Sequence, residues 1–89
     1  MISLKFTLHF KKTYKKPVRK NPDCAIDILY SLMHFAAELF YSRLETHKLS
    51  GDKKDLWSFA IQYDMRMIFG FESENTAIIV NIGSHDEVY

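Results

Sequence analysis

Residues 57–82 read WSFAIQYDMRMIFGFESENTAIIVNI, and this stretch decides the fold. Apolar residues alternate with polar or small ones over 57–63 and again over 65–71, which predicts two half-buried strands. A polar turn at 72–75 follows, and 76–82 is almost continuously apolar and rich in β-branched residues. That composition is typical of a central strand that is buried on both faces. The stretch therefore predicts an antiparallel sheet of three strands.

The N-terminal residues predict a further strand and a basic helix. Residues 2–8 alternate in polarity, as a half-buried strand does. A helix should begin at about Thr7 or Leu8, and its exposed positions are mostly lysines. Pro17 lies inside the helical pattern, where it should kink or end the helix because proline has no backbone N–H to donate.

A second helix is predicted after the break Asn21-Pro22-Asp23, with Asp23 as its N-cap and its end at about Tyr41 or Arg43. A helix that is apolar on most sides is usually buried on most sides. Such a helix lies either between a sheet and the first helix, or with part of its surface kept for a partner chain; both interpretations stay open. The polar positions of this helix form one narrow stripe, namely Asp27, Ser31, His34, Glu38 and Ser42.

One strand, two helices and three strands in 89 residues predict a single α+β domain over residues 1–89, with the antiparallel sheet packed against the two N-terminal helices. The one cysteine, Cys24, excludes an internal disulfide and a Cys-rich zinc site, and it fits a reducing cytoplasm. Charged residues interrupt the most apolar segment, 24–41, which argues against a membrane span. We therefore expect a soluble cytoplasmic protein that does not bind membranes.

Positive charge is concentrated at the N-terminus. The net charge is +1, but residues 1–20 hold seven of the twelve Lys and Arg residues and no acid. One cationic face of this kind either meets a nucleic-acid backbone or is simply a solvated surface, and charge alone does not decide between the two. The candidate contacts to RNA or to the ribosome are Lys11, Lys12, Lys15, Lys16, Arg19, Lys20 and, from a later polar loop, Lys54.

Three segments hold residues that suit acid–base and phosphate chemistry: His47-Lys48, Asp64-x-Arg66 and 85–89. The sequence has no His-x-x-x-His metal spacing and no glycine-rich phosphate loop, so we expect no metal and no cofactor. Imidazole, guanidinium, ammonium and phenol groups suit transesterification of RNA, in which the nucleophile is the substrate's own 2′-hydroxyl. That reaction needs a base, an acid and positive charge on the phosphate oxygens.

The sequence resembles the RelE/ParE toxin superfamily, and within it the RelE- and YafQ-like mRNA interferases. The resemblance runs over nearly the whole chain, and its most specific part is the final segment. The matching motifs are Phe10-Lys11-Lys12, His47-Lys48-Leu49-x-Gly51, Trp57-Ser58-Phe59, Asp64-x-Arg66-x-Ile68-Phe69 and Ile82-Gly83-Ser84-His85-Asp86-Glu87-Val88-Tyr89.

The resemblance implies a β-α-α-β-β-β fold and a ribosome-dependent endoribonuclease that cleaves mRNA in the ribosomal A site. It also implies control by a cognate antitoxin, through which alone the protein would meet operator DNA. Two alternatives stay open. One is a ParE-like toxin that inhibits DNA gyrase, and the other is a catalytically silent module of the same fold that binds its antitoxin and DNA.

The resemblance also assigns roles to individual residues. His85 is expected to be the general acid that protonates the leaving 5′-oxygen, and Arg66 to stabilise the charge on the scissile phosphate. Tyr89 is expected to stack on the nucleotide or to donate a hydrogen bond to it. His47 or Lys48 is expected to help deprotonate the 2′-hydroxyl. Asp64 is expected to orient Arg66 or a histidine. Glu87 is a second candidate for the base. We expect the tail to take its catalytic geometry only with RNA.

Overall fold

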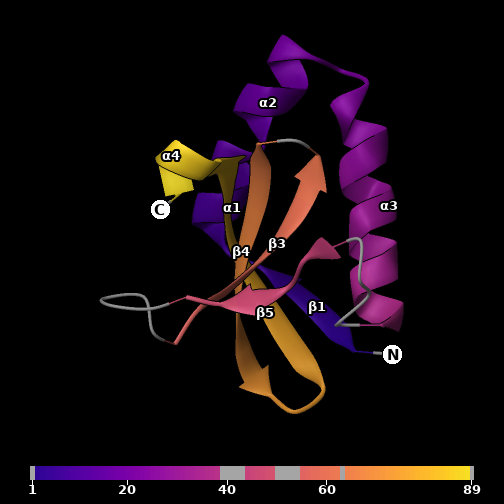
Figure 1. Ribbon diagram of the computed structural model, residues 1–89, viewed down its shortest axis with the longest axis vertical. Coiled ribbons are helices and arrows are strands. Elements are labelled where there is room, and N and C mark those ends of the chain that lie inside the picture. The colour runs from indigo at the N-terminus through magenta and orange to yellow at the C-terminus, as the bar shows by residue number, and fades with distance from the viewer. Residues whose placement is uncertain (1, 39–43, 50–54, 63, 89) are drawn as a thin grey trace.

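The computed structural model describes residues 2–38, 44–49, 55–62 and 64–88. The chain begins with a strand, continues through three helices, and then forms most of the sheet before a final helical turn (Figure 1). In chain order the elements are β1 (Ser3–Phe6), α1 (Leu8–Thr13), α2 (Lys15–Lys20), α3 (Cys24–Ala37), β2 (His47–Lys48), β3 (Trp57–Gln62), β4 (Met65–Ser73), β5 (Thr76–Ser84) and α4 (His85–Val88).

The strands form one sheet in the order β1-β5-β4-β3-β2. The three strands predicted from residues 57–82 are β3, β4 and β5, and they pair antiparallel as expected. The sheet as a whole is mixed, because β1 pairs parallel with β5. A parallel pair needs a long crossover connection, and the helices between β1 and β2 lie within that connection. The two-residue strand β2 was not predicted, and it extends the sheet beyond β3.

Helix α1 begins where the sequence predicts, and Thr7 caps it. The backbone N–H of Phe10 donates to Thr7 Oγ1 at 3.0 Å. The helical hydrogen-bond pattern has a break at Tyr14, although the backbone of Tyr14 itself is helical, with φ −57° and ψ −33°. Pro17 explains the place of this break, because a proline ring collides with the carbonyl group four residues earlier, here that of Thr13, and supplies no N–H to bond it.

Helix α3 follows Asp23, which stands at the predicted N-cap position, but its side chain makes no capping hydrogen bond. The helix ends at Ala37 and not at 41 or 43. Glu38 is already extended, and residues 39–43 lie outside the described part of the chain. The predicted polar stripe follows the solvent side only in part, since His34 and Glu38 are exposed but Ser31 is buried. An apolar stripe is exposed instead, with each side chain 57–58% accessible: Ile26, Leu29, Tyr30 and Met33.

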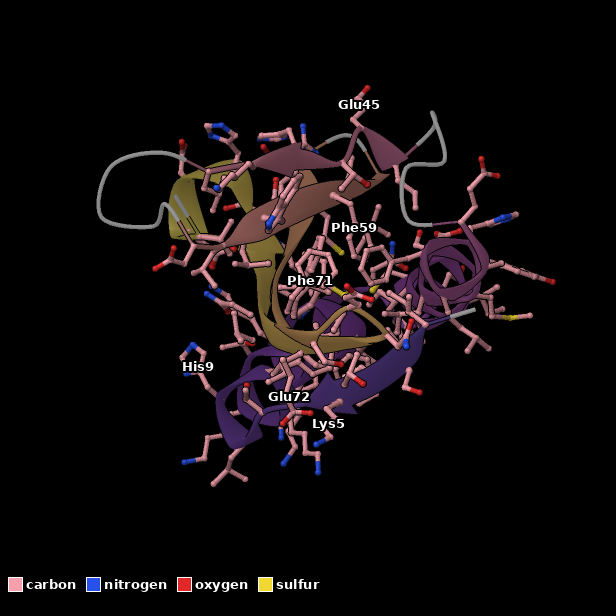
Figure 2. The ribbon with its side chains drawn as sticks, turned by 90° about the horizontal axis from the view of Figure 1, so that it is seen from below. Lys5, His9, Glu45, Phe59, Phe71 and Glu72 are labelled. Atoms are coloured by element: carbon pink, nitrogen blue, oxygen red, sulfur yellow. The ribbon has the colours of Figure 1, made fainter. Side chains whose placement is uncertain are left out.

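The core lies between α3 and one face of the sheet. Phe35 of α3 stacks on Phe59 of β3 with ring centroids 4.6 Å apart, and it meets Phe69 of β4 edge-on at 4.5 Å. All three rings are fully buried, and Phe59 points into this interior (Figure 2). Such aromatic pairs add to the free energy gained by burial alone. None of the described helices is long and apolar enough to cross a membrane.

Replacing Phe35 tests this account of the core. Phe35→Ala removes the ring that joins α3 to two strands, so the free energy of unfolding should fall by about 3–5 kcal/mol. Met33→Ala on the same helix is the matched control; its side chain is exposed, and its effect should stay within about 0.5 kcal/mol. Urea unfolding followed by circular dichroism measures both. Equal effects from the two variants would show that α3 is not packed through Phe35.

Candidate active site

The face of the sheet opposite α3 carries two of the candidate residues, His47 and Arg66. Phe59 and Met67 are paired on the α3 side, so their neighbours in sequence point to the other side. Helix α4 packs on that other side, against β5 and β4. We call it the α4 face, and the strand residues that point to it are His47, Ser58, Ala60, Arg66, Ile68, Asn81 and Gly83.

Arg66 lies in the middle of the α4 face. Its direct neighbours across the strands are Ala60 on β3 and Gly83 on β5. Both are small, so Arg66 is the one large side chain of its cross-strand row. It is half-buried, and its Nη1 donates to the Met65 carbonyl oxygen at 3.2 Å. A guanidinium in this position suits the bidentate binding of a phosphate that lies over the row.

Helix α4 is held at its start by a reciprocal pair of hydrogen bonds. The Ser84 backbone N–H donates to Glu87 Oε1 at 2.9 Å, and the Glu87 backbone N–H donates to Ser84 Oγ at 3.2 Å. This is a capping box, in which two otherwise unpaired donors at a helix start are satisfied together. Residues 85–88 thus form a defined helical turn, whereas the sequence led us to expect a tail that takes its geometry only with RNA.

Gly83 allows α4 to pack closely on β5. A Cβ atom at this position would lie 3.2 Å from Glu87 Cβ and 3.2 Å from Val88 Cγ1. Contacts this short leave little room for a side chain. Val88 is buried at 3% exposure, and it lines a small cavity together with Ile68. The turn therefore has an apolar anchor on the α4 face as well as its cap.

His85 is the first residue of α4, and Asp64 fixes its backbone. The His85 N–H donates to the Asp64 carbonyl oxygen at 2.9 Å and lies 3.4 Å from Asp64 Oδ1. Of the two partners predicted for Asp64, the structure thus pairs it with a histidine, through the backbone. The His85 side chain is 53% exposed, and its Nδ1 lies 3.7 Å from Asp86 Oδ1. An accessible imidazole at the edge of the Arg66 row is well placed to exchange a proton with a bound substrate.

His47 and Lys48 form β2, on the other side of Arg66 from α4. Lys48 pairs with Trp57, which lies on the α3 side of the sheet, so the Lys48 side chain points away from the α4 face. His47 pairs with Ser58, and its Nε2 lies 3.3 Å from Ser58 Oγ. Two strand spacings and two residues along the strand separate His47 from Arg66, so their Cα atoms are about 12 Å apart. The side chains of His47 and Arg66 can extend towards each other, so their functional groups can lie closer than the Cα atoms. A phosphodiester segment of RNA can span the distance between these groups. His47 and His85 therefore lie on opposite sides of Arg66.

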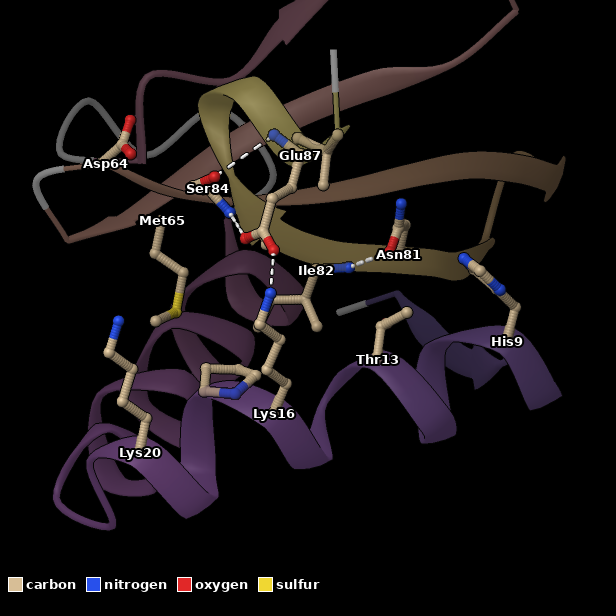
Figure 3. A pocket seen from close by; sticks show the side chains of 13 residues that line it. His9, Thr13, Lys16, Lys20, Asp64, Met65, Asn81, Ile82, Ser84 and Glu87 are labelled. Atoms are coloured by element: carbon tan, nitrogen blue, oxygen red, sulfur yellow. Dashed lines mark hydrogen bonds and ion pairs between the residues drawn. The ribbon is translucent and has the colours of Figure 1, made fainter.

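A groove of about 730 Å³ separates the α1–α2 segment from β5 and α4. Lys16 of α2 crosses it, and its Nζ lies 2.6 Å from Glu87 Oε2 (Figure 3). Lys16 and Lys20 line the groove, so the basic segment predicted from the sequence borders α4. The candidate contacts on this segment are all exposed, namely Lys11, Lys12, Lys15, Lys16, Arg19 and Lys20.

Glu87 is a structural residue in this arrangement and a poor base. The hydrogen bond from Lys16, followed by those from Ser84, lowers the pKa of Glu87 to about 2. A carboxylate with so low a pKa takes up a proton only in strong acid. The sequence hypothesis of Glu87 as a second base is therefore not favoured. The capping-box pattern Ser84-x-x-Glu87 is present in the sequence and is the signal that would have identified this role.

Two predicted site residues, Tyr89 and Lys54, lie outside the described residues. Ser58 is a residue that the sequence analysis missed. It is fully buried, and only the strand register identifies it as the partner of His47.

In the part of the chain that the structure describes, no group of three or more His, Cys, Asp or Glu side chains is arranged to hold a metal ion.

No family model matches the sequence, and no curated protein matches it. Solved structures do match. A metal-bound toxin from Helicobacter pylori has a TM-score of 0.81 at 24% identity, over 100% of both chains. YafQ in the E. coli DinJ–YafQ toxin–antitoxin complex has a TM-score of 0.79 at 13% identity, over 99% of this chain and 97% of that one. A YoeB/ParE toxin from Agrobacterium tumefaciens has a TM-score of 0.77 at 19% identity, over 94% of this chain and 99% of that one.

The protein therefore has the fold of the RelE/ParE toxin superfamily. Within that fold it is similar over its full length to YafQ and to the Helicobacter toxin. The predicted fold class, an α+β domain with N-terminal helices packed on the sheet, is confirmed; the sheet was predicted to be antiparallel, and it is mostly so, because β1 alone pairs parallel.

The low pKa of Glu87 predicts how the α4 anchor depends on pH. The folded state favours the charged carboxylate, so its contribution to stability is fully present above the ordinary pKa of 4.5 and is lost as the pH falls towards about 2. Glu87→Gln keeps the capping shape but loses the charge that pairs with Lys16. Its deficit in unfolding free energy relative to the wild type should be largest above pH 5 and should vanish near pH 2.

Denaturant unfolding at a series of pH values measures this deficit. Lys16→Gln removes the same ion pair from its other side, so its deficit should fade over the same pH range. A Glu87→Gln deficit that is constant from pH 7 to pH 2 would contradict the role of the Glu87 charge.

Proposed function

We propose that the protein is the toxin of a type II toxin–antitoxin pair and cleaves mRNA on the ribosome by metal-free transesterification. The observation that carries this proposal is the position of Arg66. It lies on the α4 face between two small neighbours, with His85 held on one side and His47 held on the other. The likeness of the fold to YafQ and to other toxins supports the same assignment.

The reaction needs a base, an acid and a positive charge from the protein. The substrate's 2′-hydroxyl loses its proton to His47, and its oxygen forms a bond to the adjacent phosphorus atom. The phosphorus–O5′ bond breaks as His85 protonates the leaving oxygen, which yields a 2′,3′-cyclic phosphate and a 5′-hydroxyl. Arg66 stabilises the negative charge that develops on the phosphate oxygens in between. Asp64 orients His85, and Tyr89 stacks on the nucleotide or donates a hydrogen bond to it.

The α1–α2 segment supplies the contact with the ribosome. Six exposed cationic side chains lie on it, and the segment borders the groove next to α4. Contacts of this kind bind the RNA backbone and weaken as salt concentration rises. Lys54, predicted from the sequence, is a further candidate contact. The same argument supports mRNA and ribosomal RNA as the nucleic-acid partners.

A cognate antitoxin is the proposed protein partner, because YafQ has been crystallised with DinJ as a toxin–antitoxin complex. We propose that operator DNA is reached only through that antitoxin and that the pair works in the cytoplasm. No cofactor enters the reaction as written, since both protons move to and from side chains of the protein.

Inducible expression with mapping of mRNA 5′ ends tests the activity. The wild type should arrest growth and cut mRNA in phase with codons. Arg66→Ala removes the guanidinium group that stabilises the negative charge of the phosphate, so it should lower the cleavage rate by about 10²–10³-fold. His85→Ala and Tyr89→Ala should also relieve the arrest. Lys5→Ala is the matched control, because it removes a cation that pairs with Glu72 at the far end of the sheet, at 2.7 Å (Figure 2).

The outcomes separate the alternatives. Growth arrest that survives all three site substitutions and comes with DNA damage would favour a gyrase inhibitor of the same fold. An absence of arrest, with the antitoxin and DNA still bound, would favour a silent module. A Lys5→Ala variant as defective as Arg66→Ala would show that the loss reflects charge or folding and not the site.

A further inference from the structure

Glu45 has an unusual backbone conformation next to the candidate base. Its φ angle is 51°, and it is the one non-glycine residue with positive φ in the part of the chain that the structure describes. This left-handed region is sterically unfavourable for side chains other than glycine, asparagine and aspartate. Strained backbone of this kind occurs where the surroundings demand it, often at functional sites. The question is what the conformation of Glu45 achieves.

The Glu45 carbonyl oxygen accepts a hydrogen bond from His47 Nδ1 at 3.0 Å. A carbonyl oxygen has no hydrogen to donate, so the hydrogen in this bond belongs to the imidazole and lies on Nδ1. In a neutral imidazole only one nitrogen carries a hydrogen, and the bond made by that nitrogen fixes the tautomer. His47 Nε2 is then the nitrogen with the lone pair.

The second partner of His47 suits both charge states of the ring. Ser58 Oγ lies 3.3 Å from His47 Nε2, and Ser58 is fully buried in β3. A hydroxyl group can donate to the bare Nε2 of the neutral ring, and it can accept from the Nε2–H of the charged ring. The ring can therefore gain and lose a proton at Nε2 without turning. Ser58 belongs to the α4 face, so the proton is exchanged on the side of the sheet that carries Arg66.

The side chain of Glu45 takes no part in this arrangement. It is exposed and points away from the interior marked by Phe59 (Figure 2). The contribution of Glu45 is thus its carbonyl group. Leu44 is buried in the core and His47 is paired in the sheet, so the peptide plane between residues 45 and 46 is confined between two fixed positions. The left-handed φ of Glu45 is the angle at which the chain from Leu44 reaches that plane.

We propose that Glu45 is a positioning residue that acts through its backbone. Its carbonyl group, in the position that the left-handed conformation allows between Leu44 and His47, holds neutral His47 in the Nδ1–H tautomer and leaves Nε2, beside Ser58, as the atom that takes up the substrate's proton. The consequence for RNA cleavage rests on the proposed function, whereas the tautomer is a property of the folded protein alone.

Two substitutions separate the backbone role from the side-chain role. Glu45→Gly deletes the side chain but adopts positive φ freely, so it should keep the tautomer. Glu45→Val also deletes the carboxylate, but its β-branched side chain disfavours positive φ. In Glu45→Val the carbonyl should turn away, and His47 should shift towards the Nε2–H tautomer.

Long-range ¹H–¹⁵N NMR of the histidine rings, in the pH range where His47 is neutral, reads the tautomer directly. The loss of one ring signal in His47→Gln assigns the spectrum. We expect a protonated Nδ1 in the wild type and in Glu45→Gly, and a fall of the Nδ1–H population in Glu45→Val. A wild type with Nε2–H, or a folded Glu45→Val variant with the wild-type tautomer, would overturn the proposal. The wild-type spectrum decides the matter even if Glu45→Val does not fold.

Cleavage rates add a separate measurement. Glu45→Gly should cleave mRNA within about twofold of the wild type, and Glu45→Val should lose about tenfold or more, since a correctly protonated base is worth at least that much. Equal losses in both variants would place the effect in the carboxylate and would overturn the backbone role. A wild type that holds Nδ1–H but cleaves no RNA would count against the proposed function and leave the positioning of His47 supported.

Discussion

The contact of Phe35 with Phe59 and Phe69 fixes which face of the sheet α3 covers. Side chains alternate between the two faces of a strand, so burying Phe59 and Phe69 against α3 sends Ser58 and Arg66 to the opposite face. A register slip of one residue would exchange the two sets. The position of Arg66 is thus set by aromatic packing on the far side of the sheet and not by the contacts that Arg66 itself makes.

The two histidines depend on local hydrogen bonds. His85 is placed by the Asp64 carbonyl and by a helical turn that Ser84 and Glu87 cap. His47 is held between the Glu45 carbonyl and Ser58. The candidate site therefore combines one long-range constraint, the packing of α3, with two short segments that each orient an imidazole. Substitutions in the short segments should change the chemistry while leaving most of the core intact.

Local sequence patterns predicted the elements that local interactions determine, namely individual strands and the start of a helix. Alternation predicted β3 and β4, a continuous apolar and β-branched run predicted β5, and the start of α1 followed from its helical spacing. The parallel partner of β1 was not predictable, because alternation marks a strand but not its neighbour. Likewise, Lys16 and Glu87 are 71 positions apart, and only the tertiary fold brings them together. The motifs that resemble the toxin superfamily contain Arg66, His47 and His85, and they identified these three residues as candidates for the site. The roles of Ser58 and Glu45 emerged only from strand register and backbone geometry, although the Ser84-x-x-Glu87 cap was already present in the sequence.

We expect this fold to carry a phosphodiester site in which the substrate's own 2′-hydroxyl is the nucleophile. The chemistry of the RNA ends, after incubation of mRNA, ribosomes and the purified protein, tests this directly. We expect a 2′,3′-cyclic phosphate, or the 3′-phosphate formed by its hydrolysis, on the upstream fragment and a 5′-hydroxyl on the downstream fragment. A 3′-hydroxyl with a 5′-phosphate, or intact mRNA, would contradict this expectation.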